Sequence, residues 1–216
     1  MQLYSFFNSS TSYRVRIALR LKNLDPAYRG VNIRTGEHRN TQFVENVNPS
    51  AVVPALVDGE FNLGQSLAII DWLDTRYPVP RLIPLEPELR ARVLEVSYLI
   101  GCDIHPVNNL RVLKYLQDVV KVTPGEKDAW YRHWIAEGIA GVERLLARAV
   151  ASHDGPWCFG DHPTLADCCL VPQIANALRM GCDLSQFKRS LEVYRYASEH
   201  PAFVAAEPKR QLDYVA

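Results

Sequence analysis

Residues 8–24, NSSTSYRVRIALRLKNL, decide how the first part of the chain folds. Four consecutive hydroxyl side chains, Ser9 to Ser12, stand directly before a stretch in which Val15, Ala18 and Leu19 recur at helical spacing. A helix start needs only one capping hydroxyl, and its unpaired backbone N–H groups favour an anion. The segment therefore predicts a helix. Its first turn carries either one cap with solvated hydroxyls or a site that stabilises a thiolate or carboxylate.

Strands and helices alternate around this helix as far as Tyr77. Turn-forming residues such as Asp58-Gly59 separate them. Strands are expected at residues 2–7, 27–33, 52–57 and 60–64, and further helices at 41–47 and 66–77, the last capped by Ser66. The order β-α-β-α-β-β-α predicts an α/β domain with a mixed sheet.

The remainder of the chain has only helical patterns. Prolines 78, 80, 84 and 87 crowd into ten residues and mark a linker. Helical patterns follow at residues 86–121, 126–152, 162–181, with Pro172 as an expected kink, and 188–199. We therefore expect an α/β domain over 1–78, a linker over 79–87 and an all-α domain over 88–216.

Composition excludes several classes of function. Lys plus Arg equals Asp plus Glu at 24 each, so no overall charge attracts nucleic acid or an anionic membrane. The sequence shows neither a signal peptide nor a membrane-spanning stretch, and its five cysteines form no C-x-x-C pair and no metal-binding cluster. We expect a cytoplasmic protein with reduced thiols and no bound metal. Cys168-Cys169 is either a redox pair or two buried, inert residues.

Five motifs resemble one known family. SSTSYRVRIAL resembles the SSCSWRVRIAL signature of zeta-class glutathione transferases, the maleylacetoacetate and maleylpyruvate isomerases. The resemblance continues, in order and at compatible spacing, through NPSAVVPAL, QSLAIIDWL, GCDIHPVNNLRVLKYL and FGDHPTLADCCLVPQIANALR. It covers nearly the whole chain. It implies a thioredoxin-like N-terminal domain, an all-α C-terminal domain, a homodimer and glutathione as the cofactor.

The resemblance implies that the glutathione sulfur lies at the start of the first helix. Ser9, Ser10 and Thr11 would be beside it, and the neighbouring residues Ser12, Tyr13 and Arg14 would help to hold the peptide. Lowering a thiol pKa from about 8.5 by roughly two units requires about 2.7 kcal/mol. A hydrogen bond to the anion supplies about 1.5–3 kcal/mol and the helix terminus about 0.3–1 kcal/mol, so no dedicated base is needed. The family signature has Cys where this chain has Thr11, and which hydroxyl contacts the sulfur stays open.

Other parts of glutathione have implied partners. Gln65 and Ser66 match the pair that grips the γ-glutamyl end, and Ser66 at a helix start suits a carboxylate. Val53-Pro54 resembles the family's cis-proline turn, which pairs with the cysteinyl part. His38 matches a position near the glycine end, although a loop histidine is also a common solvated residue.

The helical domain has its own candidates. His105, Asn109 and Arg111 lie in the region that the family places over the site; on a regular helix His105 and Asn109 share a face, whereas Arg111 does not unless Pro106 distorts the turn. Arg179 matches an arginine that faces the substrate carboxylate, which suits a guanidinium fork. Its alternative role is to pair with the last carbonyls of its own helix.

The resemblance implies glutathione-dependent cis–trans isomerisation of a small dicarboxylic keto acid, in the breakdown of tyrosine or another aromatic compound. Arg179, with Arg111, would orient the carboxylates, and maleylacetoacetate and maleylpyruvate both remain possible substrates. Many relatives have Arg where this chain has Asn8, which removes one cation from the site. The alternatives are a general transferase or dehalogenase acting on small electrophiles, and a non-catalytic docking module. Thr164 and Asp167 are assigned to a helix capping box, hence to folding.

Overall fold

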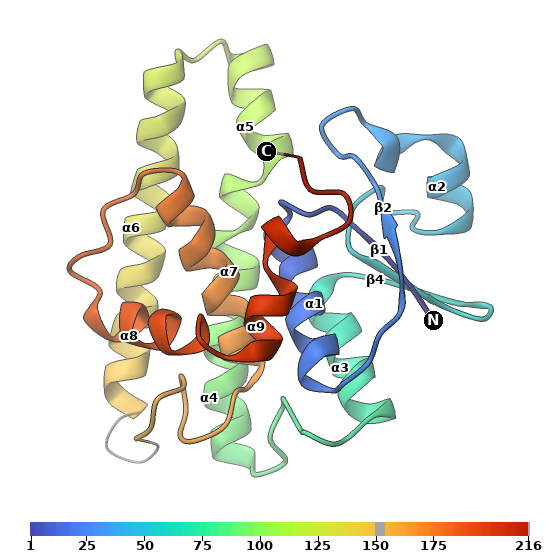
Figure 1. The fold of residues 1–216 in the computed structure, drawn as a ribbon. Coiled ribbons are helices and arrows are strands. Elements are labelled where there is room, and N and C mark those ends of the chain that lie inside the picture. The colour runs from blue at the N-terminus through green and yellow to red at the C-terminus, as the bar shows by residue number, and fades with distance from the viewer. Residues whose placement is uncertain (150–153, 216) are drawn as a thin grey trace. The chain divides into compact units, whose positions relative to one another are not determined.

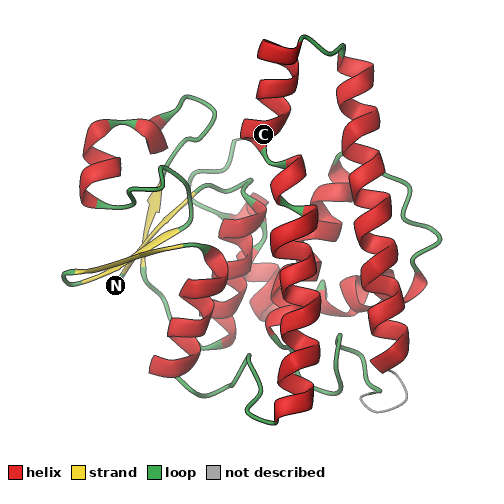
Figure 2. Cartoon of the chain, turned by 180° about the vertical axis from the view of Figure 1, so that it is seen from behind, coloured by secondary structure: helices red, strands yellow, loops and turns green. Residues whose placement is uncertain are grey.

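The computed structural model describes residues 1–149 and 154–215, and it divides the chain into two compact units. The first contains residues 1–83 together with 198–216, and the second contains residues 84–197. Figure 1 labels the elements, and Figure 2 shows that strands occur beside helices in the first unit, whereas the second is helical. The predicted fold class, a thioredoxin-like α/β domain and an all-α domain, is confirmed.

The first unit is built on a four-stranded mixed sheet with strand order β2-β1-β3-β4. β1 pairs parallel with β2 and antiparallel with β3, and β3 pairs antiparallel with β4, so Leu3 lies between Tyr28 and Leu56. The strands are β1 (Gln2–Ser5), β2 (Ala27–Gly30), β3 (Ala55–Asp58) and β4 (Phe61–Gly64). All four lie inside or within one residue of the stretches expected from composition.

Helices α1 (Ser10–Leu21), α2 (Thr41–Asn46), α3 (Ser66–Arg76) and α9 (Pro201–Ala206) complete this unit. The expected apolar face of α1 is buried, and α1 lies against α3 and α9. Helix α9 was not expected, and it takes residues 198–216 out of the predicted second domain. The cause is tertiary: Phe203 is fully buried, and the Arg16 guanidinium donates from Nε to the Ala206 carbonyl at 2.9 Å.

The predicted linker is partly structural. The Asp74 carboxylate accepts hydrogen bonds from the backbone N–H groups of Leu82 and Ile83 at 2.8 and 2.9 Å, and it pairs with the buried Lys22 ammonium at 2.7 Å. These bonds hold residues 79–83 on α3 and extend the first unit five residues beyond the predicted boundary at 78.

The second unit contains α4 (Pro87–Tyr98), α5 (Leu110–Tyr115), α6 (Pro124–Ala149), α7 (Leu165–Arg179) and α8 (Lys188–Ala197). The expected helix over 86–121 is not continuous. A π-helical segment (Leu99–Ile104) and a 3-10 turn (Pro106–Asn108) interrupt it, because Pro106 lacks the N–H that a regular helix requires. Residues 150–152 of the expected helix over 126–152 lie outside the described residues.

The start of α7 confirms the assignment of Thr164 and Asp167 to capping. The buried Asp167 carboxylate accepts bonds from the Thr164 backbone N–H at 2.7 Å, the Thr164 hydroxyl at 2.9 Å and the Cys158 N–H at 2.8 Å. Cys168 and Cys169, further along α7, are both fully buried and form no disulfide. They are buried core residues, as the interpretation of Cys168-Cys169 as two buried, inert residues predicted.

No helix within residues 1–149 and 154–215 combines the length and the apolar character that crossing a bilayer requires. Over the same ranges, the acidic, histidine and cysteine side chains nowhere gather in a group of three that could hold a metal ion.

Candidate active site

The hydroxyl cluster at the start of α1 divides into capping and bridging groups. Ser9 is the N-cap, with extended backbone (φ −83°, ψ 120°), and its Oγ accepts a bond from the Ser12 backbone N–H at 3.2 Å. Ser10 is the first helical residue and is buried. Ser12 is fully buried, and its hydroxyl oxygen accepts the Phe6 N–H at 3.4 Å, so it supports the preceding turn. A contact of Ser12 with glutathione therefore stays a prediction.

Ser9, Thr11 and Val53 form a short hydrogen-bond relay. The Thr11 hydroxyl donates to the Val53 carbonyl at 3.1 Å, and it lies 2.9 Å from Ser9 Oγ. A hydroxyl has one proton, and that of Thr11 is used on Val53, so Ser9 must be the donor to Thr11. The relay thus runs from Ser9 through Thr11 to the backbone of the proline turn. Releasing the Val53 carbonyl would free one O–H donor at the helix start.

The Val53-Pro54 peptide bond is cis, which confirms the prediction. Val53 is buried, and the turn lies directly before β3. Position 11 and position 53 are therefore in contact although 42 residues separate them in the sequence. The structure brings together two of the motifs that the sequence could only place in order.

The start of α3 is another helix N-terminus of this unit with predicted binding residues. Gln65, and not Ser66 as expected, is the N-cap; Ser66 is the first helical residue and is buried. Gln65 adopts φ 65° and ψ 116°, a left-handed conformation that costs a non-glycine residue about 1–3 kcal/mol. Since such conformations concentrate at binding and catalytic sites, the strained turn supports the predicted role of the Gln65-Ser66 pair.

Arg14 links the two helix starts. Its side chain is 1% exposed, and Nη1 donates to the Ser66 hydroxyl at 3.4 Å. The Arg14 Nε and Nη2 atoms are buried without a hydrogen-bond partner among the described residues. A buried polar atom without a partner is rare, and a buried cation needs a compensating anion. An anion bound at Ser66 would provide one, so the residues present fit the carboxylate of a γ-glutamyl group.

Two further predicted residues of this unit have local partners. The Tyr13 hydroxyl donates to the Phe203 carbonyl at 3.4 Å, which joins α1 to α9. His38 lies in a 3-10 turn (Glu37–Arg39), where its Nε2 accepts a bond from Arg39 Nε at 3.4 Å, and it is half-buried. Contacts of Tyr13 and His38 with glutathione stay predictions.

In the second unit, Pro106 changes the geometry of the predicted trio. Asn109 is the N-cap of α5: its Oδ1 accepts the Arg111 backbone N–H at 3.1 Å, and its Nδ2 lies 3.3 Å from His105 Nε2. His105 and Asn109 are therefore in contact, as expected. The Arg111 side chain is exposed, and Arg111 is the second residue of α5.

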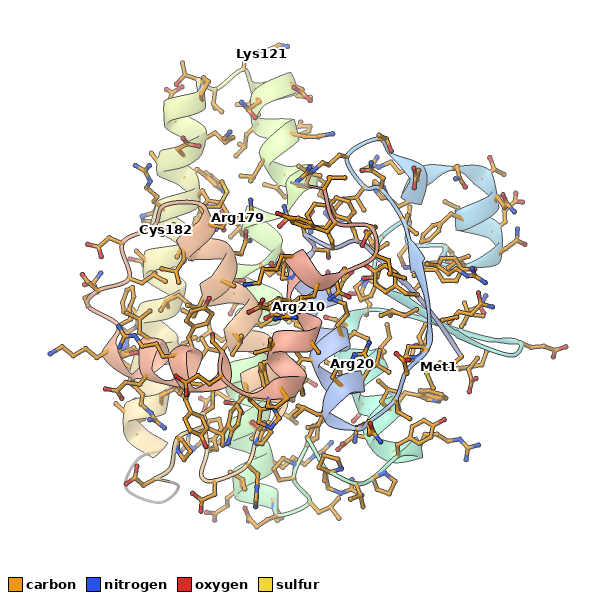
Figure 3. The ribbon with its side chains drawn as sticks, viewed as in Figure 1. Met1, Arg20, Lys121, Arg179, Cys182 and Arg210 are labelled. Carbon is orange, nitrogen blue, oxygen red and sulfur yellow. The ribbon has the colours of Figure 1, made fainter. Side chains whose placement is uncertain are left out.

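Arg179 is the last residue of α7 and is exposed (Figure 3). Its Nη2 donates to the Asn176 side-chain oxygen. The charged group therefore remains accessible.

Tyr131, on α6, was not among the residues predicted from the sequence. It is 3% exposed, and its hydroxyl has no hydrogen-bond partner among the described residues. Burial raises the pKa of Tyr131, and the nearby charge of Arg179 opposes this rise.

The comparisons with known proteins agree along the whole chain. The family model of the glutathione S-transferase N-terminal domain matches residues 3–81. Maleylacetoacetate isomerase of Pseudomonas aeruginosa is 44% identical over 216 residues, covering 99% of this chain and 98% of the relative. The zeta-class glutathione S-transferase of Euphorbia esula is 39% identical over 214 residues, covering 99% of this chain and 92% of the relative. The chain belongs to the zeta class of glutathione transferases.

Solved zeta-class structures share the complete fold. The holo structure of a bacterial maleylpyruvate isomerase of this class superposes with a TM-score of 0.95 at 42% identity, and it covers 100% of both chains. The maleylacetoacetate isomerase of Anaeromyxobacter dehalogenans, solved with glutathione in its active site, gives a TM-score of 0.85 at 36% identity over 98% of this chain and 96% of that one.

Proposed function

We propose that this chain is a glutathione-dependent cis–trans isomerase that converts a maleyl-keto acid, either maleylacetoacetate or maleylpyruvate, to its fumaryl isomer. The observation that carries the proposal is the start of α1, where the Ser9–Thr11 relay ends on the Val53 carbonyl, directly before Pro54. Membership of the zeta class and the isomerase names of its relatives support it. Bound glutathione supplies a thiolate that adds reversibly to the substrate double bond, which can rotate while it is single.

The residues at the two helix starts divide the binding of glutathione between them. Ser66, with Gln65 before it and Arg14 behind it, holds the γ-glutamyl carboxylate through a hydroxyl, backbone N–H groups and a buried positive charge. The Val53 backbone orients the cysteinyl part. The proposal also includes His38, at the glycine end, and His105, Asn109 and Arg111 of the second unit.

Thr11 gives the site a means of switching on when the peptide binds. If a peptide N–H pairs with the Val53 carbonyl, Thr11 no longer needs to donate there, and its O–H can turn to the sulfur. Ser9 continues to donate to Thr11 Oγ1, which strengthens the Thr11 donor. Together with the partial positive charge of α1, one such bond suffices to keep the sulfur ionised at neutral pH.

Arg179 binds a carboxylate of the substrate, because it is exposed and its guanidinium can form two parallel bonds. Arg111, also exposed, would hold the second carboxylate, because this chain has the uncharged Asn8 where many relatives have an arginine. The proposal includes a homodimer located in the cytoplasm, as the resemblance to the family implies.

The test is an absorbance assay with maleylacetoacetate and with maleylpyruvate, each with and without glutathione. We expect isomerisation of at least one acid that depends on glutathione and leaves no conjugate. Turnover without glutathione, or an accumulating conjugate with no isomer, would contradict the proposal and, in the second case, favour a general transferase.

Arg179→Ala separates substrate binding from glutathione binding. We expect kcat/KM for the keto acid to fall by about 100-fold, the cost of losing a charge-assisted bidentate contact, while glutathione affinity is unchanged. Arg195→Ala is the matched control, since Arg195 is likewise an exposed arginine in the last turn of a helix. An equal loss of both properties in Arg179→Ala would indicate a structural role.

A further inference from the structure

The turn that leads into α1 determines where the hydroxyl relay lies. It runs from Phe6 to Ser9 and is closed by a bond from the Ser9 N–H to the Phe6 carbonyl at 3.0 Å. Ser9 follows it at once as the helix N-cap. Any shift of this turn therefore moves the Ser9 and Thr11 hydroxyls.

Two charged side chains hold the central residue of the turn from opposite sides. Arg16 donates from Nη2 to the Phe7 carbonyl at 3.0 Å and from Nη1 to the Phe6 carbonyl at 3.2 Å. The Asp213 Oδ2 atom accepts the Phe7 N–H at 2.9 Å, across 206 residues of sequence. Both peptide groups of Phe7 thus have charged partners, and charge-assisted bonds are about twice as strong as neutral ones.

Asp213 is itself fixed by the outer strand of the sheet. The Tyr28 hydroxyl on β2 donates to Asp213 Oδ1 at 2.6 Å. Gly30, at the end of the same strand, leaves the space that Asp213 occupies: a Cβ there would lie 2.9 Å from Asp213 Cβ. The next residue, Tyr214, packs its ring edge-on against Phe7, with centroids 5.4 Å apart. The segment after α9, red in Figure 1, therefore anchors the turn to the sheet.

The side chains of this network differ in burial: Arg16 is buried, whereas Asp213 and Tyr28 are half-buried. Burial lowers the pKa of Arg16 to about 10, while the neighbouring Asp213 and Tyr28 oppose the shift. Burial also raises the pKa of Tyr28, so its hydroxyl remains a proton donor at neutral pH. The Arg16 guanidinium therefore stays charged at neutral pH where it meets the turn.

We propose that Asp213 is a positioning residue for catalysis: by holding the Phe7 N–H it fixes the turn that places the Ser9 and Thr11 hydroxyls against the glutathione sulfur. This inference rests on the proposed function. The sign of the change in the thiol pKa distinguishes this positioning role of Asp213 from a direct electrostatic effect of its charge. Removing a negative charge near the site should by itself favour the thiolate and lower the thiol pKa, whereas loss of positioning should raise it.

Two variants separate these effects. Asp213→Asn removes the charge and leaves a single side-chain oxygen to accept from both the Phe7 N–H and the Tyr28 hydroxyl. Gly30→Ala keeps the charge but displaces Asp213, because the new Cβ overlaps with Asp213 Cβ. Glu207→Gln is the matched control, since it neutralises a carboxylate of the same segment that pairs with Lys209.

Two readouts are required. The first is hydrogen exchange of the Phe7 amide in the ligand-free protein by NMR, and the second is the pKa of the bound glutathione thiol from the ultraviolet absorbance of the thiolate. We expect both Asp213→Asn and Gly30→Ala to accelerate exchange by about tenfold or more and to raise the thiol pKa by about one unit, a tenfold loss of anion stabilisation. Glu207→Gln should change neither quantity.

Other results would overturn the inference in distinct ways. Unchanged Phe7 exchange in both variants would show that Asp213 does not hold the turn. Faster exchange with an unchanged or lowered thiol pKa would show that the turn does not position the hydroxyls. A wild-type protein whose bound thiol titrates like free glutathione would contradict the proposed function, and the inference with it. Gly30→Ala serves as the second test if Asp213→Asn does not fold.

Discussion

Replacing Arg14 by Met should weaken glutathione binding by about 100-fold. Arg14 Nη1 lies 3.4 Å from Ser66 Oγ, and a carboxylate accepting from that hydroxyl would lie roughly 3 Å further away. The two charges would then be about 6 Å apart. With an effective dielectric constant of about 20, their attraction is about 2.8 kcal/mol, which corresponds to about two powers of ten in affinity.

The assay is calorimetric titration of wild type, Arg14→Met and Arg14→Lys with glutathione and with an analogue whose γ-glutamyl group lacks its α-carboxylate. We expect the large loss only for Arg14→Met with intact glutathione, and a smaller loss for Arg14→Lys, which keeps the charge. With the analogue, wild type and Arg14→Met should bind almost equally.

The free energy of unfolding provides the control for Arg14. Because Met has a similar volume and no charge, we expect a change within about 1 kcal/mol, or a gain. This role of Arg14 is excluded if Arg14→Met binds glutathione as tightly as wild type does, or if it loses the same affinity for the analogue. A loss of about 3–5 kcal/mol in stability would show instead that the guanidinium holds the core together.

Three other substitutions test separate parts of the account. Thr11→Val should raise the pKa of the bound thiol, measured by thiolate absorbance, by about one to two units, whereas the control Thr11→Ser should keep this pKa low. Equal pKa values in the two variants would show that another hydroxyl contacts the sulfur. Gln65→Gly should weaken glutathione binding by about tenfold in calorimetry without lowering the free energy of unfolding, since it relieves a left-handed conformation; a clear loss of stability would argue against strain there. Asp167→Ala should lower the free energy of unfolding by about 3–5 kcal/mol in urea titrations, because two buried N–H groups lose their acceptor, and a loss below about 1 kcal/mol would contradict the capping role.

Much of the first unit could be predicted from the sequence because its elements are local. The apolar period of α1 and the β-α-β-α-β-β-α order depend on neighbouring residues, and the structure confirms them. The turn expected at Asp58-Gly59 lies one residue later, at Gly59-Glu60. The start of α7 was also predictable, since a capping box lies within four residues.

The remaining features depend on contacts distant in sequence. Nothing in the period of residues 198–215 indicates that Phe203 and Asp213 belong to the sheet unit. Likewise, the left-handed conformation of Gln65 is imposed by the fold and shifts the helix cap by one residue from Ser66. The division of the hydroxyls into cap, relay and turn support required the position of Val53, 42 residues away.

The tyrosine of α6 illustrates the same limit in the second unit. A Tyr in a helical apolar pattern is ordinary core, and only its orphaned hydroxyl and the charge of Arg179 nearby single out Tyr131. Pro106, by contrast, was visible in the sequence as a residue that disfavours a regular helix, although the helical pattern over 86–121 was expected to be continuous.

If the first turn of α1 keeps a bound thiol ionised at neutral pH, a pH titration of glutathione bound to the wild-type protein will show it. Thiolate absorbance at saturating glutathione should give a midpoint at least about one unit below the value of roughly 8.5 for an ordinary thiol. A midpoint equal to that of free glutathione, with binding otherwise intact, would contradict the account.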